Sequence, residues 1–462
     1  MPSSKPNDTS ALSQQLAEYK IKKDVTKIKI PNGLLSFPRE ILTPFDTLTI
    51  LDLSGNTSLS SLPKDISRLH KLKIAFFSNC SFATFPKELA QCRSLEMVAF
   101  KGNHMTSVPE HAFPRKLRWL ILTNNEIEVL PKSIGQCHRL QKCMLAGNRL
   151  RKLPDEMRHC RKLGLLRLSS NELEELPDWL FELPELSFLS FAGNPCSSIP
   201  SSGVNEQQQQ LDDIAWAELE VQHLLGEGAS GIISKGTWKT TTTSAEEQKE
   251  KPVAIKLFKG DVTSDGSPLD EMAATLTAGK HPHLIDPLGR IITHPSPDQK
   301  GLVLELIPPS YINLGLPPTL DTCTRDSFHP EMVMSVEMCK GILLGIASAA
   351  EHLHERGIKH GDLYAHNILL ERNSGHALLG DFGAATVYGK EFEKAEALER
   401  MEVFAFGHLV EDLLGLVEHK LDESEKDAYA IEALNSLHWK CSNTVVMDRP
   451  SFAEVREELD GF

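Results

Sequence analysis

The chain has 462 residues, of which 40% are hydrophobic and 24% charged, and its formal net charge is −14. This is the composition of an ordinary globular protein, and the length predicts two or three domains of about 150 residues each. The acidic balance argues against a general binder of nucleic acid or of anionic membranes.

The sequence predicts neither secretion nor a membrane span. Residues 1–10 are polar and lack the apolar core of a signal peptide, and the mostly apolar run 341–350 is too short to cross a bilayer. The nine cysteines form no Cys-x-x-Cys pair, the spacing of zinc and redox sites. We therefore expect a cytoplasmic protein with reduced thiols, beginning with a polar arm at residues 1–24.

Residues 48–200 repeat with a period of 22 or 23 residues. Each repeat has leucines in a fixed frame, then an asparagine, then a proline after a bulky apolar residue. The prolines are Pro63, Pro86, Pro109, Pro131, Pro154, Pro177 and Pro200. The asparagines are Asn56, Asn103, Asn125, Asn148, Asn171 and Asn194, with Cys80 in their place once. This frame resembles the leucine-rich repeat, which implies an α/β solenoid over residues 25–200 with seven repeats and a cap or degenerate eighth at 25–38.

In such a solenoid each repeat buries its apolar face only against its neighbours, and the asparagines are expected to satisfy backbone groups of the turns. Strand positions between the frame leucines should point to the concave face. One row there reads Ile50, Ile74, Met97, Trp119, Lys142, Leu165, Phe188, and the next reads Asp52, Phe76, Ala99, Ile121, Met144, Arg167, Ser190.

These rows are unusually apolar for a solenoid surface and predict a docking face for an external protein partner. The candidate contact residues are Ile74, Phe76, Met97, Trp119, Ile121, Met144 and Phe188. The alternative is that the chain's own N-terminal arm, or the domain after the repeats, covers part of this face. Residues 201–217, which include four consecutive glutamines and lack periodic apolar positions, are expected to form a linker.

A Gly-x-Gly-x-x-Gly pattern opens the second half at Gly226, Gly228 and Gly231. Glycines let a tight hairpin bring backbone N–H groups onto phosphate oxygens. The same pattern in a dinucleotide fold is followed directly by a helix, whereas residues 232–238 here predict a strand. The next strand ends at Lys256, and a buried lysine needs a charge partner. Glu271, on a helix predicted at 269–278, is our candidate, and Asp270 remains an alternative.

Two further motifs lie nineteen residues apart, Asp362 within His-Gly-Asp-Leu-Tyr-Ala-His-Asn (360–367) and Asp381 within Asp-Phe-Gly (381–383). Phosphoryl transfer needs one carboxylate to orient the attacking hydroxyl, and a second carboxylate and an amide to hold Mg²⁺. Asp362 fits the first role, and Asp381 and Asn367 fit the other two. A polar turn between two strands would explain the residues without chemistry, but not why the other motifs occur in order.

Residues 218–462 resemble a tyrosine-kinase-like protein kinase domain, on these motifs and on the ending Asp-Arg-Pro-Ser-Phe at 448–452. The resemblance implies an α+β bilobal fold that transfers the γ-phosphate of ATP, with Mg²⁺, to protein hydroxyls. We expect these hydroxyls to belong to serine or threonine, and tyrosine remains an alternative. We also expect the repeats to select the substrate or partner. It assigns Asp362, Lys256 and Glu271 to catalysis and Asn367 and Asp381 to the metal. The nucleotide would contact Gly226, Glu227, Gly228, Gly231, Ile233, Lys256, Glu305 and Ile307.

The catalytic loop departs from the family pattern. Gly361 replaces an arginine that answers a phosphate on the activation segment, which predicts no such phosphate control. Tyr364 stands where Ser/Thr kinases carry lysine. His366 stands where many tyrosine kinases carry arginine, either as a pH-sensitive cation or as a histidine that only hydrogen-bonds the loop.

The region after the loop departs as well. Only residues 384–401 separate Gly383 from Glu402, which stands where the family has aspartate, and no clear Ala-Pro-Glu is present. Arg449, whose family partner is that missing glutamate, is expected to find another acid. The candidates are Glu391, Glu393 and Glu399.

Two other functions fit these departures. His-Gly-Asp also occurs in small-molecule kinases such as aminoglycoside and choline kinases, which usually lack the Asp-Phe-Gly and Arg-Pro-Ser-Phe motifs. An ATP-binding pseudokinase scaffold is the second alternative. Retention of Lys256, Asp362 and Asp381 favours catalysis, because charged groups gathered in one cleft are costly to desolvate unless they are used.

Overall fold

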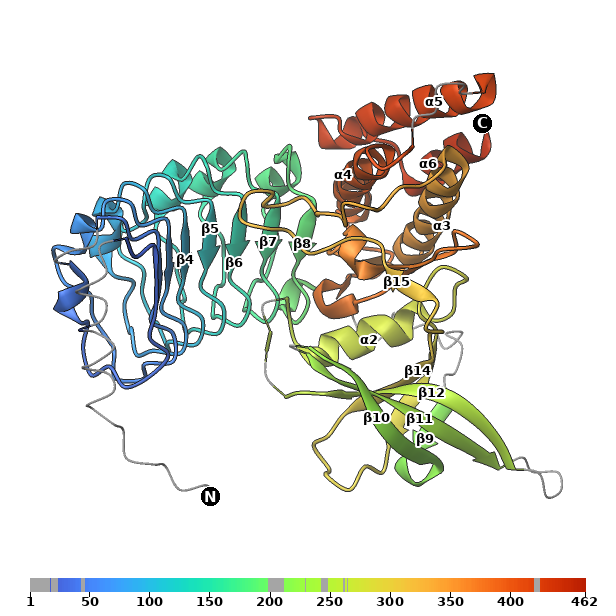
Figure 1. Cartoon of the computed structure of the whole chain (residues 1–462), viewed down its shortest axis with the longest axis horizontal. Helices are drawn as coiled ribbons and strands as arrows, with labels where there is room; N and C mark the ends of the chain where they lie inside the picture. The colour runs from blue at the N-terminus through green and yellow to red at the C-terminus, as the bar shows by residue number, and fades with distance from the viewer. Residues whose placement is uncertain are drawn as a thin grey trace. The chain divides into compact units, whose positions relative to one another are not determined.

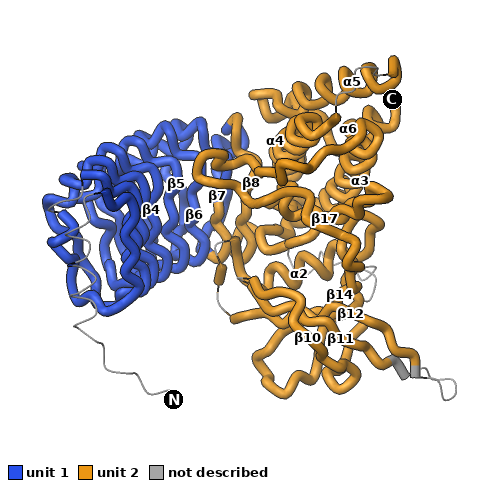
Figure 2. The backbone as a smooth tube through the Cα atoms, in the orientation of Figure 1, with its two compact units in different colours: residues 1–166, 171–183 blue, residues 167–170, 184–462 orange. Residues whose placement is uncertain are grey.

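The computed structural model describes residues 17, 24–42, 46–197, 212–228, 230–241, 248–260, 262–263, 265–418 and 424–462. Nearly all of the predicted N-terminal arm, most of the predicted linker, and Pro200 therefore lie outside the described residues. The chain divides into two compact units (Figure 2). One comprises the described residues up to 166 together with 171–183, and the other comprises residues 167–170 and 184–462.

Within the described ranges, eight short parallel strands form one sheet in sequence order, which confirms the predicted solenoid (Figure 1). They are β1 (Lys27–Lys29), β2 (Ile50–Asp52), β3 (Ile74–Phe76), β4 (Met97–Ala99), β5 (Trp119–Ile121), β6 (Lys142–Met144), β7 (Leu165–Arg167) and β8 (Phe188–Ser190). Frame leucines such as Leu51, Leu120 and Leu166 are fully buried, because each repeat supplies the wall of the next. Short 3₁₀ helices follow the repeat prolines, as at Lys87–Gln91 after Pro86.

The asparagines form the predicted ladder of backbone hydrogen bonds. Asn125 Nδ2 donates to Phe100 O (2.9 Å) and Leu122 O (2.8 Å), and its Oδ1 accepts from Met105 N (3.0 Å). Asn148 repeats the arrangement one turn later. The Cys80 thiol, which stands in an asparagine position, still donates to Leu53 O at 3.3 Å. These asparagines therefore have a structural role.

Asn125→Ala is expected to lower the free energy of unfolding of the repeats by about 3 kcal/mol, because buried backbone groups lose their partner. Chemical denaturation of the full chain measures the change. Gln136→Ala, which removes an exposed carboxamide in the same repeat, is the control and should shift the transition by less than about 0.5 kcal/mol. Equal shifts for the two variants would contradict the ladder's structural role.

The N-terminal part of the second unit's kinase-like region is a twisted sheet with strand order β10-β11-β12-β14-β13-β9. The strands are β9 (Asp212–Ala215), β10 (Leu219–Glu227), β11 (Gly231–Thr241), β12 (Gln248–Phe258), β13 (Pro287–Ile292) and β14 (Gly301–Glu305). Helix α2 (Pro268–Ala278) begins at Ser267, whose side chain accepts a hydrogen bond from Leu269 N. The core under the sheet contains Val253, Ile255 and Val303.

Strand β9 lies where the sequence analysis placed the end of the linker. It pairs in parallel with β13, and Ile214 is buried among the core residues of the sheet. One apolar residue in a four-residue strand gives no periodicity, so the pairing is decided by contacts distant in sequence.

The C-terminal part is mainly helical, which confirms the predicted bilobal fold (Figure 1). Its helices are α3 (Val336–His354), α4 (Ala395–Leu414), α5 (Glu425–Cys441) and α6 (Phe452–Asp460). Its short strands are β15 (Tyr311–Asn313), β16 (Ile358–Lys359), β17 (Ile368–Glu371), β18 (Ala377–Leu379) and β19 (Thr386–Val387). Across the residues that the structure describes, none of the helices is both long and apolar enough to cross a membrane.

Candidate active site

Asp362 and Asn367 lie together on the loop between β16 and β17. Asn367 Nδ2 donates to the Asp362 backbone oxygen at 2.9 Å and to its carboxylate Oδ2 at 2.8 Å. Gly380 N donates to Asn367 O at 2.9 Å, which joins this loop to the residue preceding Asp381. The three oxygen-bearing residues predicted from the sequence are therefore held by one hydrogen-bonded framework.

Glu402, on α4, anchors the backbone of the Asp362 loop. Its carboxylate accepts hydrogen bonds from Gly361 N (2.6 Å), His360 N (3.2 Å) and His354 Nε2 (2.8 Å). Burial alone raises the pKa of Glu402, but Lys359, His354 and His360 outweigh it and hold that pKa well below its usual range. The glutamate noted as a departure is thus the ionised acceptor that fixes the loop.

Lys256 and Glu271 form an ion pair between β12 and α2. Lys256 Nζ contacts Glu271 Oε1, and the two side chains are only 12% and 4% exposed. Burial raises the pKa of Glu271, and the charge of Lys256 opposes this effect. Asp270, the alternative candidate, is the adjacent position on α2 and therefore lies about 100° around the helix from Glu271.

The Asp-Phe-Gly motif follows β18, with its acid exposed and its phenylalanine buried. Asp381 has a left-handed backbone, φ 55°, and its Oδ1 accepts from Gly383 N at 3.1 Å. The Phe382 ring packs edge-on against His360, with 5.2 Å between ring centroids, while His360 Nε2 bonds Gly380 O at 2.9 Å. This packing turns the Asp381 carboxylate outward.

The donor set fits Mg²⁺ shared with phosphate. Among the described residues no group of three His, Cys, Asp or Glu side chains could form an all-protein metal cage. Mg²⁺ is usually held by one or two carboxylate or amide oxygens, with water and phosphate completing its shell. Asp381 offers an exposed carboxylate, and Asn367, whose nitrogen is engaged with Asp362, offers its amide oxygen.

The glycine-rich segment is a hairpin between β10 and β11, with Gly226 opposite Ile233 and Glu227 opposite Ile232. A strand therefore follows the glycines, as predicted, and the helix of a dinucleotide fold is excluded. A Cβ on Gly231 would lie 2.6 Å from Leu257 O, so this position requires glycine. A Cβ on Gly228 would meet nothing within 4 Å, which leaves open space beside the hairpin.

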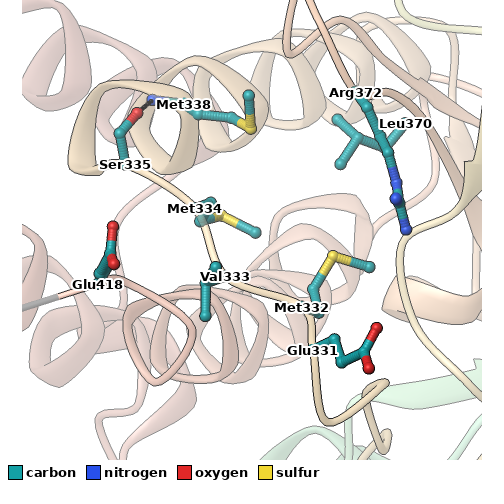
Figure 3. Close-up of a pocket in the computed structure, with 9 residues that line it drawn as sticks. All are labelled: Glu331, Met332, Val333, Met334, Ser335, Met338, Leu370, Arg372 and Glu418. Atoms are coloured by element: carbon teal, nitrogen blue, oxygen red, sulfur yellow. Dashed lines mark hydrogen bonds between the residues drawn. The ribbon is translucent and has the colours of Figure 1, made fainter.

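Two cavities of the second unit lie apart from these charged groups. Glu305 and Ile307 line one of about 500 Å³, together with residues such as Tyr311 and His376. Another, of about 450 Å³, is lined mainly by residues 331–335 with Met338, Leu370, Arg372 and Glu418 (Figure 3). Neither lining contains Lys256, Asp362 or Asp381, so cavity size alone would not locate the candidate site.

Arg449 has partners other than the acids suggested by the sequence. In the described part of the chain it donates to three backbone oxygens, those of Asn443 (2.8 Å), Arg400 (3.2 Å) and Pro184 (2.7 Å). Burial lowers the pKa of Arg449 to about 10. The prediction that Glu391, Glu393 or Glu399 replaces the missing family acid is therefore wrong, because main-chain carbonyls satisfy the guanidinium.

Arg167 is a site residue that the sequence analysis missed. Its guanidinium contacts the carboxylate of Asp362, donates to Gly361 O at 2.7 Å and donates to Asp265 Oδ1 at 3.0 Å. Burial raises the pKa of Asp362, but the charges of Arg167, His366 and His360 outweigh it, so the pKa is lowered. The available signal was one arginine that follows a run of apolar residues, Phe76 to Met144, in its row of strand positions.

His366 is paired with Asp326 rather than directed at open solvent. Its Nδ1 lies 2.8 Å from Asp326 Oδ1, and its backbone N donates to Asp326 Oδ2 at 3.0 Å. Burial lowers the pKa of His366, but the hydrogen bond and charge of Asp326 outweigh it, so the pKa is raised. The histidine therefore ties the loop to Asp326, which lies outside it, and is also biased toward the charged form.

This raised pKa predicts a pH-dependent stability that His366→Asn should remove. Because the folded pKa is above the unfolded one, near 6.5, the stabilisation is full below about pH 6 and is lost as pH rises through the folded pKa. Chemical denaturation of both proteins from pH 6 to 8.5 measures the difference in free energy of unfolding. If the difference in free energy of unfolding between the two proteins stays constant from about pH 6 to 8.5, His366 does not titrate in that range.

Comparisons with known proteins agree with this geometry. Residues 219–405 match the family model described as protein tyrosine and serine/threonine kinase, and residues 47–69 match the leucine-rich repeat model. A probable serine/threonine-protein kinase of Dictyostelium discoideum is 23% identical over 55% of this chain and 29% of its own length. A probable cyclin-dependent kinase 10 of the same organism is 31% identical over 37% of this chain and 41% of its own length.

The human receptor tyrosine-protein kinase erbB-4 is also similar, at 29% identity over 40% of this chain and 13% of its own length. The chain thus spans less than half the length of each of these three relatives, which include both serine/threonine and tyrosine kinases. The matched models, the eight-stranded repeat sheet of the described residues and the bilobal unit agree with one another. The chain thus joins a sheet of leucine-rich-repeat type to a unit in which residues 219–405 match the protein tyrosine and serine/threonine kinase model.

Proposed function

We propose that this chain is an ATP-dependent protein kinase that phosphorylates serine or threonine hydroxyls. The observation that carries the proposal is the framework in which Asn367 bonds Asp362 while Gly380 N bonds Asn367 O. It fixes the Asp362 carboxylate beside the Asn367 amide and joins this loop to the residue that precedes Asp381. Phosphoryl transfer depends almost entirely on such positioning and charge placement.

Each residue has a separate task in this proposal. When bound, Mg·ATP would supply the phosphoryl group, and its Mg²⁺ would neutralise negative charge on the phosphate oxygens. Lys256, held by Glu271, presents its ammonium to phosphate oxygens, and Asn367 and Asp381 present oxygens to the metal. Asp362 would accept a hydrogen bond from the acceptor hydroxyl and take its proton as that oxygen bonds to the γ-phosphorus, while the bond from the γ-phosphorus to the bridging oxygen breaks and ADP leaves.

The remaining nucleotide contacts are proposed for backbone groups. The hairpin residues Gly226, Glu227, Gly228, Gly231 and Ile233 border the open space beside the glycines. Lys259 Nζ steadies this hairpin by donating to Glu227 Oε1 (2.8 Å) and Gly228 O (3.0 Å). Glu305 ends β14 and Ile307 lies just after it, where the adenine edge would meet main-chain groups.

Serine/threonine specificity is favoured by relatives named as serine/threonine kinases, among them the fly kinase PITSLRE. The test is transfer from γ-labelled ATP and Mg²⁺ to mixed protein acceptors by the full chain, followed by phosphoamino-acid analysis. Label on serine or threonine supports the proposal, and label on tyrosine alone overturns the specificity. ATP binding without transfer by any variant would favour the scaffold alternative, which the contact of Arg167 with Asp362 also fits.

We further propose that the concave face of the repeats docks a protein partner or substrate. Phe76, Trp119, Ile121 and Met144 are partly exposed there, whereas Ile74 and Met97 are 6% and 7% exposed and form its floor. Phe188 is buried, and its ring stacks on Tyr364 of the same compact unit. Phe188 therefore packs against the chain's own loop. At this one residue the chain itself covers the face, as the alternative in the sequence analysis expected.

The double substitution Trp119→Asp with Met144→Asp is expected to abolish retention of a partner while the repeats stay folded. The physical reason is that two charges on a partly exposed apolar patch must be desolvated when the partner binds. Co-purification of the partner with the tagged full chain measures its retention, and circular dichroism shows whether the variant stays folded. Val129→Asp, at a residue 67% exposed outside both rows, is the control. Partners kept by the double variant would sink the docking face.

A further inference from the structure

The last strands of the repeat sheet supply side chains to the loop that carries Asp362. Arg167 ends β7, and Phe188 and Ser190 lie on β8. Residues 167–170 and 184–197 belong to the same compact unit as the candidate catalytic residues. Their contacts with the loop are therefore part of the internal packing of one unit.

Arg167 occupies the carboxylate that the acceptor hydroxyl needs. One Asp362 oxygen, Oδ1, contacts Arg167 Nη2, and the other, Oδ2, accepts from Asn367 Nδ2 at 2.8 Å. A general base must reach the proton that it takes within hydrogen-bond distance. Both oxygens already accept a hydrogen bond, Oδ2 from the proposed metal-binding asparagine and Oδ1 from the guanidinium, so the acceptor hydroxyl would have to compete with Arg167 for the carboxylate.

Arg167 is fixed in this position on every side. Its other nitrogens donate to Gly361 O (2.7 Å) and Asp265 Oδ1 (3.0 Å), and the residue is 1% exposed. Asp265 lies just before α2, the helix that carries Glu271. One buried side chain thus joins the catalytic loop to the segment leading into the Lys256–Glu271 pair. A buried guanidinium between two carboxylates is a stable arrangement only while both remain in place.

Strand β8 also covers the loop itself. The Phe188 ring stacks on Tyr364 with 3.9 Å between centroids and 7° between planes, and Tyr364 is only 6% exposed. Phe191 N donates to the Thr386 hydroxyl on β19 at 3.1 Å, and the Ser190 hydroxyl donates to Asp265 O at 3.1 Å. An acceptor chain that brings its hydroxyl to Asp362 must pass over this same surface.

Gly361 allows this close approach. Its φ is 75°, and a Cβ there would lie 2.6 Å from Ala384 O and 2.9 Å from Leu189 O of β8. A side chain at this position would clash with the strand that carries Phe188. The absence of the usual arginine and the seating of β8 are therefore one structural feature.

We propose that Arg167 and β8 hold this kinase in an autoinhibited state, and that activation requires Arg167 to leave Asp362. The inference rests on the proposed kinase function, because it assigns regulation to the same site. Arg167 is not placed as a catalytic cation, since the neighbouring strand β8 covers the route of the acceptor.

The test compares the full chain with Arg167→Ala, Asp265→Asn and the control Arg151→Ala, whose side chain is 76% exposed. At saturating Mg·ATP, Arg167→Ala should raise the rate of phosphate transfer by roughly tenfold or more, because the buried pair of Arg167 with Asp362 no longer stabilises the autoinhibited state. Asp265→Asn leaves the repeats and the catalytic loop intact and should raise transfer by a smaller factor. Arg151→Ala should match the wild type. Transfer that is unchanged or lower in the Arg167 and Asp265 variants would overturn the inference, a decrease identifying Arg167 as an aid to catalysis.

Hydrogen–deuterium exchange separates failure of this inference from failure of the proposed function. Arg167→Ala and Asp265→Asn should speed exchange of backbone amides in residues 186–192 and 361–367, and Arg151→Ala should not. Unchanged exchange overturns the autoinhibitory contact whatever the activity. Faster exchange with no transfer by any variant, wild type included, overturns the kinase function and leaves the occlusion of Asp362 standing.

Discussion

Asp362→Asn is expected to lower the rate of phosphate transfer by roughly a thousandfold, while ATP binding changes little. The amide has the size of the carboxylate but cannot accept the hydroxyl proton, and the loop hydrogen bond from Asn367 can persist through its oxygen. Lys256, Asn367 and Asp381 are untouched. The rate of transfer and the ATP dissociation constant should therefore separate in this variant.

The measurement is best made in the Arg167→Ala background as well as in the wild type. Arg167 contacts Asp362, so a substitution in the wild type also removes an ion pair. In the Arg167→Ala background only the chemistry of the carboxylate changes. If the double variant transfers phosphate as fast as Arg167→Ala alone, Asp362 is not the base and the assignment of the site is wrong.

Asp381→Asn is expected to cut transfer by roughly a hundredfold and to shift the Mg²⁺ dependence to higher concentration. The exposed carboxylate is the charged protein ligand in the proposed metal site, and an amide binds Mg²⁺ more weakly. Transfer rates across a Mg²⁺ titration, at fixed ATP, give both effects.

Asp298→Asn, which removes an exposed carboxylate from the segment between β13 and β14, is the matched control and should leave the Mg²⁺ curve unchanged. A normal Mg²⁺ curve for Asp381→Asn, with only the maximal rate reduced, would mean that Asp381 orients the phosphate without binding metal.

Most of the fold could be predicted because its signals are local. The leucines and asparagines recur every 22 or 23 residues, and each repeat buries its apolar face against the next. The eight-stranded sheet of the described residues follows from this pattern. The glycine-rich segment could be placed on a hairpin because residues 232–238 after it predict a strand and not a helix. The pairing of Lys256 with Glu271 needed only a buried lysine and an acid on a nearby helix.

What could not be predicted depends on contacts between distant positions. Arg167 and Asp362 are separated by 195 residues, and the local sequence around Arg167 is that of any repeat strand. Arg449 was expected to find an acid because the family pairs it with one, whereas packing brings backbone oxygens to it first. In the sequence, Glu402 could be recognised only as a departure from the family pattern. Its role follows from the hydrogen bonds that its carboxylate accepts from two backbone amides of the loop.

Gly361 also limits how this molecule can change over evolutionary time. With a positive φ and a carbonyl on either side of the missing Cβ, the position has no room for the arginine that would answer a phosphate. A single substitution of Gly361 by arginine would therefore disrupt the packing of β8 against the catalytic loop. Phosphate-dependent control through an arginine at position 361 would require β8 to move first, so this packing and that form of control exclude each other.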